Sequence, residues 1–128
     1  MRRQESILVI EDEPNLRRTL VMILRQAGYA VTAVDHSEDA LRSIDAQAYD
    51  LIFLDVDHIE FDGADLLATI YRLRPTISLL ILTASPAIET IDRSNPIGRQ
   101  ACLIKPIDPS QMLACIRNIL DRPMPSPS

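Results

Sequence analysis

Short apolar runs alternate with stretches of helical periodicity along the chain. The apolar runs are rich in Val, Ile, Leu and Ala, and they occupy Ile7–Ile10, Ala30–Val34, Leu51–Leu54, Leu79–Leu82 and Ala101–Ile104. Apolar runs without polar alternation are typical of strands that are buried on both faces, as in a parallel sheet. We therefore predict five strands at these positions.

The segments between the runs predict helices. The first has apolar residues at three- and four-residue spacing, and Gly28 follows it as the expected stop. The second is expected to begin with Ser37 as its N-cap. We expect a third helix from about Ala64 to Arg74, and a last one that opens at Asp108-Pro109.

The segment after the fourth strand carries a weaker helix signal. Pro86 can start a helix, but Pro96 would break it, so we predict a short or irregular helix that ends by about Ser94. The resulting order, a strand and a helix repeated five times, indicates an α/β domain with a parallel sheet and helices on both faces. The proline- and serine-rich residues 122–128 predict a disordered tail or the start of a linker, which leaves residues 1–121 as the domain.

Size and charge narrow the class of protein. A chain of 128 residues forms one domain that can bury a core without a disulfide or structural metal. The formal net charge of −5 argues against direct nucleic-acid binding by this domain. The apolar run near the N-terminus is too short for a signal peptide or a membrane span, so we expect a cytoplasmic protein that does not enter the membrane.

The positions of the two cysteines and two histidines in the sequence indicate neither a disulfide nor a zinc site. Cys102 and Cys115 both fall in apolar segments and are expected to be reduced interior residues. His36 and His58 lack the spacing of a zinc site, so each is interpreted as a lone surface histidine.

Polar residues follow four of the predicted strands. Glu11 and Asp12 follow the first, Asp55 the third, Thr83 the fourth and Lys105 the fifth. In open α/β sheets the functional site lies at the carboxyl ends of the strands. Taken singly, Thr83 is better explained as a turn hydroxyl, and Asp55 is as well explained as a cap. Their joint placement indicates a site.

The residue types in this group suit phosphoryl chemistry. Lys105 is the only lysine beside twelve arginines, and an ammonium group can clamp a single phosphoryl oxygen. Several carboxylates close together need a cation, and an all-oxygen donor set suits Mg2+. A hydroxyl at Thr83 can donate to a second phosphoryl oxygen. Asp55 is then the carboxylate that can attack phosphorus and form an acyl phosphate.

The chain resembles the receiver domains of two-component response regulators, the CheY-like family. The resemblance covers about residues 5 to 121, and its motifs are Ile7-Leu8-Val9-Ile10-Glu11-Asp12-Glu13-Pro14, Leu54-Asp55, Asp62-Gly63, Leu82-Thr83-Ala84-Ser85 and Leu103-Ile104-Lys105-Pro106. It implies a flavodoxin-like receiver fold, a doubly wound five-stranded parallel sheet of order 2-1-3-4-5.

The resemblance also implies a role for each site residue. Asp12 would hold Mg2+ directly and Glu11 would act in the same acidic pocket, with Asp55 and the backbone carbonyl of Asp57 as further ligands. Asp55 would be the phosphoacceptor, and Thr83 and Lys105 would bind the phosphoryl oxygens. A cis peptide is expected before Pro106.

The implied function is a phosphorylation switch in a phosphorelay. A histidine kinase or phosphotransfer protein would donate the phosphoryl group, and phosphorylation would change affinity for a downstream protein or an output domain. The only catalysis expected is transfer to Asp55 and its reversal by hydrolysis, without independent metabolic activity. Homodimer formation is left open.

Several positions depart from the family pattern. Cys102 replaces the usual aromatic residue three before the lysine, and Ile59 replaces the usual proline four after Asp55. Asp57 adds a fourth acid, interpreted first as a solvated loop carboxylate and alternatively as a group that alters access of water or metal. These departures keep a pseudo-receiver, a binding module without the chemistry, as the main alternative. A phosphohydrolase of the haloacid dehalogenase type, suggested by Asp55-Val56-Asp57, is a weaker one.

Overall fold

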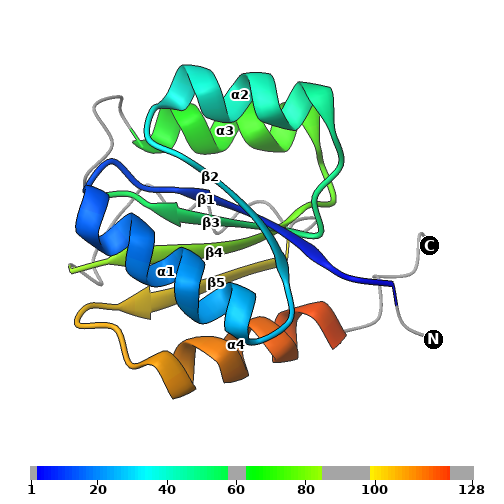
Figure 1. The fold of residues 1–128 in the computed structure, drawn as a ribbon. Helices are drawn as coiled ribbons and strands as arrows, with labels where there is room; N and C mark the ends of the chain where they lie inside the picture. The colour runs from blue at the N-terminus through cyan, green and yellow to red at the C-terminus, as the bar shows by residue number, and fades with distance from the viewer. Residues whose placement is uncertain (1–2, 58–62, 85–98, 122–128) are drawn as a thin grey trace.

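The computed structural model describes residues 3–57, 63–84 and 99–121. They form a five-stranded parallel sheet in the order β2-β1-β3-β4-β5, with helices on both faces (Figure 1). The strands are β1 (Ser6–Ile10), β2 (Ala30–Val34), β3 (Leu51–Asp55), β4 (Ser78–Thr83) and β5 (Arg99–Ile104). The helices are α1 (Pro14–Gln26), α2 (Ser37–Ala46), α3 (Gly63–Leu73) and α4 (Pro109–Asp121). The predicted α/β fold and strand order are confirmed.

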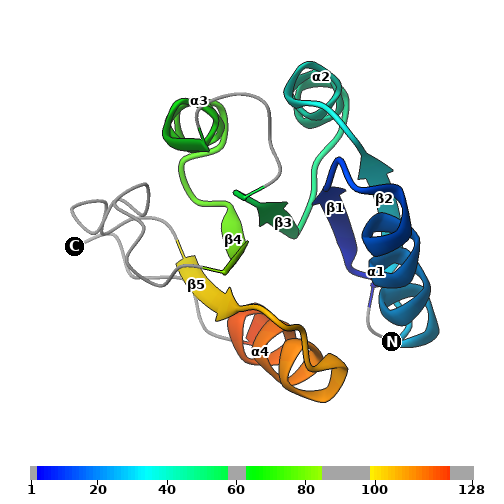
Figure 2. The ribbon, with the colours of Figure 1, turned by 90° about the vertical axis from the view of Figure 1, so that its left-hand side faces the viewer.

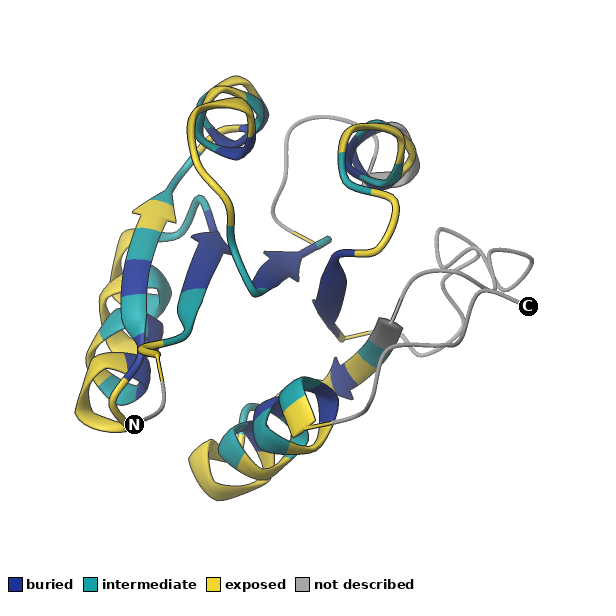
Figure 3. Ribbon diagram, turned by 90° about the vertical axis from the view of Figure 1, so that its right-hand side faces the viewer, coloured by how far each residue is buried: buried dark blue, intermediate teal, exposed yellow. Residues whose placement is uncertain are grey.

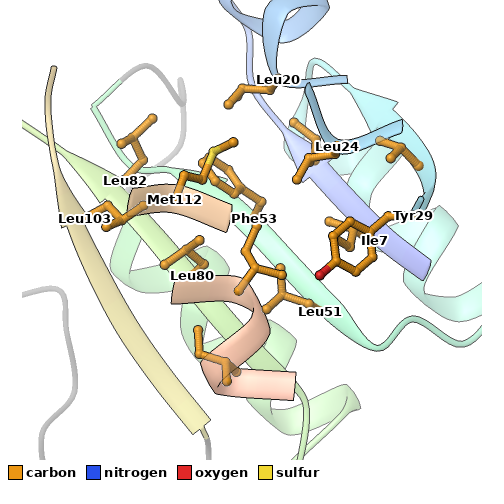
Figure 4. Close-up of a cluster of buried hydrophobic side chains, with 14 residues drawn as sticks. Ile7, Leu20, Leu24, Tyr29, Leu51, Phe53, Leu80, Leu82, Leu103 and Met112 are labelled. Carbon is orange, nitrogen blue, oxygen red and sulfur yellow. The ribbon is translucent and has the colours of Figure 1, made fainter. Parts of the chain in front are cut away.

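Two hydrophobic clusters fill the space between the sheet and its helices. One lies under α1 and α4 and contains Phe53, Leu80 and Met112 (Figure 4). The other lies under α2 and α3 and contains Ile52, Leu54 and Ile70. Figure 2 shows the two helix pairs on opposite faces of the sheet. Successive residues of a strand point to opposite faces, so each central strand contributes to both clusters.

Burial follows the position of each strand in the sheet. The strands β3 and β4 are buried along their whole length, and β1 is buried except at Ser6 (Figure 3). The edge strand β2 has only Val31 buried. The prediction of strands buried on both faces therefore holds for the central strands and fails at this edge, where one side of the backbone has no neighbouring strand.

The edge strand β5 corrects one prediction about the cysteines. Leu103 packs in the cluster beneath α4, whereas Cys102 is exposed and Ile104 keeps 53% of its surface exposed. Alternate residues of β5 face away from α4, so the expectation of an interior position is wrong for Cys102. Both cysteines are free, as predicted, and Cys115 is partly buried.

The start of α4 agrees with the sequence prediction, whereas the starts of α2 and α3 each differ from it by one residue. Asp108 accepts a hydrogen bond from the Ser110 backbone N–H at 3.0 Å, directly before the start of α4 at Pro109. In α2 the N-cap is His36, in an extended conformation, and Ser37 is the first helical residue. The prediction of Ser37 as N-cap is therefore wrong by one residue. The predicted third helix is displaced by one residue at each end.

Some predictions concern residues outside the described ranges. These are the short helix that ends by about Ser94, the tail at 122–128, the surface position of His58, and the effects of Ile59 and Pro96. Among the helices that the described residues form, none has the length and apolar character needed to cross a membrane.

Gly28 ends α1 by a backbone conformation that other residues rarely adopt. Its φ is +101°, and it follows the C-cap residue Ala27. We expect Gly28→Ala to lower the free energy of unfolding by about 1–2 kcal/mol, the cost of a Cβ in left-handed backbone. An added Cβ would meet no atom within 4 Å, so steric clash contributes nothing. Urea denaturation measures the change.

Asn is the matched control at this position because it tolerates left-handed backbone better than Ala. Gly28→Asn should recover part of the stability lost in Gly28→Ala. Equal stability of the native chain and the alanine variant would contradict this account of the helix end.

Candidate functional site

The sheet brings four of the predicted site residues to one edge. Asp55 is the last residue of β3 and Thr83 the last of β4, while Glu11 and Lys105 directly follow β1 and β5. Backbone hydrogen bonds extend the ladder past the strand ends, from Glu11 N–H to the Val34 oxygen at 3.0 Å and from Lys105 N–H to the Thr83 oxygen at 2.8 Å. The side chains are thus positioned by the rigid part of the fold. The peptide bond between Lys105 and Pro106 is cis, as expected.

The Lys105 ammonium group lies between two carboxylates. Its Nζ is 2.9 Å from Asp55 Oδ2 and donates a hydrogen bond to Asp55 Oδ1 at 3.1 Å. It also lies 3.3 Å from Asp57 Oδ2. Burial alone would lower the pKa of Lys105, but the hydrogen bond and charge of Asp55, followed by those of Asp57, raise it overall. Lys105 is therefore charged at neutral pH.

Glu11 and Asp55 are both completely buried. Glu11 Oε2 accepts a hydrogen bond from the Glu13 backbone N–H at 3.0 Å, whereas Oε1 accepts none from a protein donor in the described part of the chain. Burial, followed by hydrogen bonding with Asp55 and the Asp55 charge, raises the pKa of Glu11 to about 8. Two buried carboxyl groups in contact share a hydrogen bond only when one of them is protonated.

This pair of acids fits a divalent cation. A cation bound by these two acids would replace the proton that Glu11 otherwise holds. The carboxylate oxygens of Glu11 and Asp55 suit a hard ion such as Mg2+. Asp12 follows Glu11 in the same loop. The Arg17 guanidinium fixes this loop by donating to the Glu11 backbone oxygen at 3.0 Å.

Asp57 is not a freely solvated loop carboxylate. Its Oδ1 accepts a hydrogen bond from Thr83 Oγ1 at 3.0 Å, and its Oδ2 accepts one from the Ala84 backbone N–H at 2.6 Å. Its own backbone N–H donates to Asp55 Oδ1 at 3.0 Å. Burial would raise the pKa of Asp57, but the bonds from Ala84, Thr83 and Lys105 lower it overall. Asp57 is exposed, as the first interpretation from sequence expected, but donors at the strand ends bind its carboxylate, which that interpretation did not include.

The structure thus joins five of the predicted site residues into one network. The sixth, Asp12, directly follows Glu11 in the chain. Contacts link Glu11, Asp55, Asp57, Thr83 and Lys105. The contribution of Ala84, made through its backbone, was missed because a main-chain donor has no signature in the sequence. His36, outside the network, is exposed as predicted, and its Nδ1 lies 2.6 Å from Asp35 Oδ1.

Comparison with known proteins gives a consistent family. The family model of the response regulator receiver domain matches residues 7–117. The transcriptional regulatory protein ZraR of Escherichia coli is 34% identical over 115 residues, which is 90% of this chain and 26% of ZraR. The transcriptional regulatory protein GlrR of Escherichia coli is 28% identical over 120 residues, 94% of this chain and 27% of GlrR. The chain thus spans about a quarter of the length of these relatives.

Solved structures agree on the fold. A two-component response regulator from Clostridium difficile is 28% identical with a TM-score of 0.82, and the match covers 93% of this chain and 98% of that one. The response regulator TrrA of Thermotoga maritima, solved in complex with Mg2+-BeF, is 24% identical with a TM-score of 0.78, covering 91% and 99%. With the acidic, hydroxyl and lysine positions gathered at one edge of the sheet, the chain belongs to the response regulator receiver domain family.

Proposed function

We propose that this domain is a phosphorylation-dependent switch in which Asp55 accepts a phosphoryl group from a histidine kinase or a phosphotransfer protein. The observation that carries the proposal is the buried Asp55 carboxylate, held 2.9 Å from the ammonium group of the only lysine and in contact with a second buried acid, Glu11. A buried carboxylate beside a cation and a second buried acid is arranged for phosphoryl transfer rather than for structural support.

The residues of the acidic pair would also hold Mg2+. We assign Asp12, Glu11 and Asp55 as the carboxylates and the backbone carbonyl of Asp57 as a further ligand, Glu11 acting directly or through water. When bound, the ion neutralises these acids and draws negative charge from the phosphoryl oxygens. The Mg2+-BeF complex of TrrA supports this assignment by family likeness.

The reaction is a transfer between two nucleophiles. An Asp55 carboxylate oxygen forms a bond to phosphorus while the P–N bond of the donor phosphohistidine breaks, and the electron pair stays on the imidazole nitrogen. Lys105 and the Thr83 hydroxyl bind phosphoryl oxygens and so stabilise the developing charge. The product is an acyl phosphate, which water later hydrolyses to restore Asp55.

The consequence of phosphorylation is a change in local charge. The acyl phosphate carries about −1.5 to −2 in place of a carboxylate, which draws Thr83 and Lys105 toward it. We propose that this shifts the loop after β4 between two arrangements that differ in affinity for a partner protein, a second copy, or an output domain. The relatives named as transcriptional regulators support the last of these, an output domain. A cytoplasmic location belongs to the same proposal, since ATP-dependent kinases supply the phosphoryl group there.

The alternatives are less well supported. A pseudo-receiver would not need to keep a buried Asp55 paired with Lys105 and Glu11. A phosphohydrolase of the haloacid dehalogenase type is disfavoured by the family match, and Asp55-Val56-Asp57 stands at the end of the third strand, whereas the motif of that family follows the first.

Incubation with a small phosphodonor and Mg2+ tests the proposal directly. We expect the native chain to gain the mass of one phosphoryl group, measured by intact-protein mass spectrometry, and Asp55→Asn to gain none. An equal gain in the variant would reject Asp55 as the acceptor, and no gain in the native chain with either a small phosphodonor or a phosphohistidine protein would reject the proposed function.

Lys105→Arg should slow phosphorylation by about 10²-fold, the usual cost of one lost oxyanion donor. The planar guanidinium cannot replace a compact ammonium group between Asp55 and the phosphoryl oxygens. The phosphorylation rate with the same small donor measures the effect. Arg42→Lys is the matched control, because Arg42 is exposed on α2 and the exchange also conserves charge.

Glu11→Gln should change the pH dependence of stability in EDTA. The raised folded pKa of about 8 means that the native state keeps a proton that the unfolded state loses near 4.5. The free energy of unfolding of the native chain should therefore fall as pH rises through this window, by at most about 1.4 kcal/mol per pH unit. Gln mimics the protonated acid and should remove this slope.

Urea denaturation at pH 5 and pH 7.5 compares the two chains. Parallel pH profiles would show that Glu11 ionises normally in the fold. Adding Mg2+ at pH 7.5 should stabilise the native chain more than Glu11→Gln, because the carboxylate is then a ligand.

A further inference from the structure

The Asp57 carboxylate engages three donors that converge from two strand ends. They are the Thr83 hydroxyl at 3.0 Å, the Ala84 backbone N–H at 2.6 Å and the Lys105 ammonium group, 3.3 Å from Oδ2. Two of these groups are the ones that the proposed function assigns to the phosphoryl oxygens. The third, Ala84 N–H, points to the same carboxylate and completes a small oxyanion-binding site.

A carboxylate and a phosphoryl group make similar demands on such a site. Each presents anionic oxygens in a compact arrangement, and each is bound by ammonium groups, hydroxyls and backbone N–H groups. A donor that serves one oxyanion is not available to another in the same direction. Occupation by Asp57 and binding of a phosphoryl group therefore compete.

The local backbone holds Asp57 in reach of these donors. Its N–H donates to Asp55 Oδ1 at 3.0 Å, which ties the loop to the carboxylate that is to be phosphorylated. The side chain nevertheless keeps 24% of its surface exposed, so it can turn toward water without opening the core.

We infer that the Asp57 side chain is an internal occupant of the phosphoryl-oxygen site, which a phosphodonor must displace before Asp55 can react. The inference rests on the proposed function and adds a regulatory residue to it. Displacement breaks the contacts from Thr83, Ala84 and Lys105 to Asp57 and forms contacts from the same groups to the phosphoryl oxygens. No proton is transferred to Asp57 in the exchange.

Displacement of Asp57 is easier for a phosphodonor that makes additional binding contacts with the domain. A small phosphodonor must displace Asp57 with the phosphoryl group alone. A phosphohistidine protein that docks on the domain can use its protein contacts for the same purpose. The occupied site therefore lowers reactivity toward small donors relative to protein donors.

Fluoroberyllate, a tetrahedral phosphoryl analogue, tests the inference without any transfer step. Its affinity in the presence of Mg2+ is measured by calorimetry for the native chain, Asp57→Asn and Asp57→Ala. We expect at least about a tenfold gain in both variants, equivalent to 1.4 kcal/mol. Both substitutions keep the backbone carbonyl that the proposed function assigns to the metal.

Asp45→Asn is the matched control, because Asp45 is exposed on α2 and its replacement changes the net charge equally. Its affinity for fluoroberyllate should stay within about twofold of the native value, since screening weakens the effect of a distant surface charge. A second readout is the NMR signal of the Ala84 amide in the metal-free domain. It should move upfield in Asp57→Asn, which replaces a charged acceptor by a neutral one, and should not move in Asp45→Asn.

The outcomes separate the inference from the proposed function. Native binding without a gain in the Asp57 variants, or a gain equal to that of Asp45→Asn, overturns the inference and leaves the proposed function intact. Binding by the Asp57 variants but not by the native chain supports the inference in its strongest form. Absence of binding in all variants overturns both.

Discussion

The ammonium group of Lys105 is the centre on which the site depends. It pairs with the carboxylates of Asp55 and Asp57, of which Asp55 is completely buried. Without it, Asp55 and Glu11 would bring two acids into a medium that solvates neither, and a buried charge left unpaired is strongly unfavourable. The same group that keeps the resting site stable is the one that would bind an incoming phosphoryl oxygen. The contact between Lys105 and Asp55 therefore serves both the stability of the fold and the proposed phosphoryl transfer.

The parallel sheet fixes the position of the contact between Lys105 and Asp55. Every strand ends at the same edge, and the backbone ladder continues to Lys105 through its N–H bond to Thr83 at 2.8 Å. Residues that are far apart in the sequence, such as Asp55 and Lys105, are thereby placed within hydrogen-bond distance by main-chain geometry. The polar side chains only have to occupy the last position of a strand or the first position after it.

The sequence allowed much of the fold to be predicted, for reasons that are local. Continuous apolar runs identified the five strands, and Gly28 marked the end of α1 because its backbone requires a glycine-like conformation. The N-cap of α2 was misplaced because His36 and Ser37 both stand beside the boundary, and the choice depends on backbone angles. The exposure of Cys102 could not be predicted either, since it depends on which face of an edge strand is covered.

The candidate site, too, could be predicted from the sequence only in part. Glu11, Asp55, Thr83 and Lys105 could be named from their positions after apolar runs. The contacts of Asp57 could not, because a loop residue acquires its partners only when two other strands end beside it. The Ala84 N–H was beyond reach for a different reason, since every non-proline residue carries this donor.

The division of the core into two clusters has a consequence for how the domain can vary. Phe53 and Leu54 are consecutive, yet each belongs to a different cluster on opposite sides of the sheet. A change of side-chain volume beneath α1 and α4 needs no compensating change beneath α2 and α3. One helix layer can therefore diverge to suit a new binding protein while the other, and the strand ends between them, keep their packing.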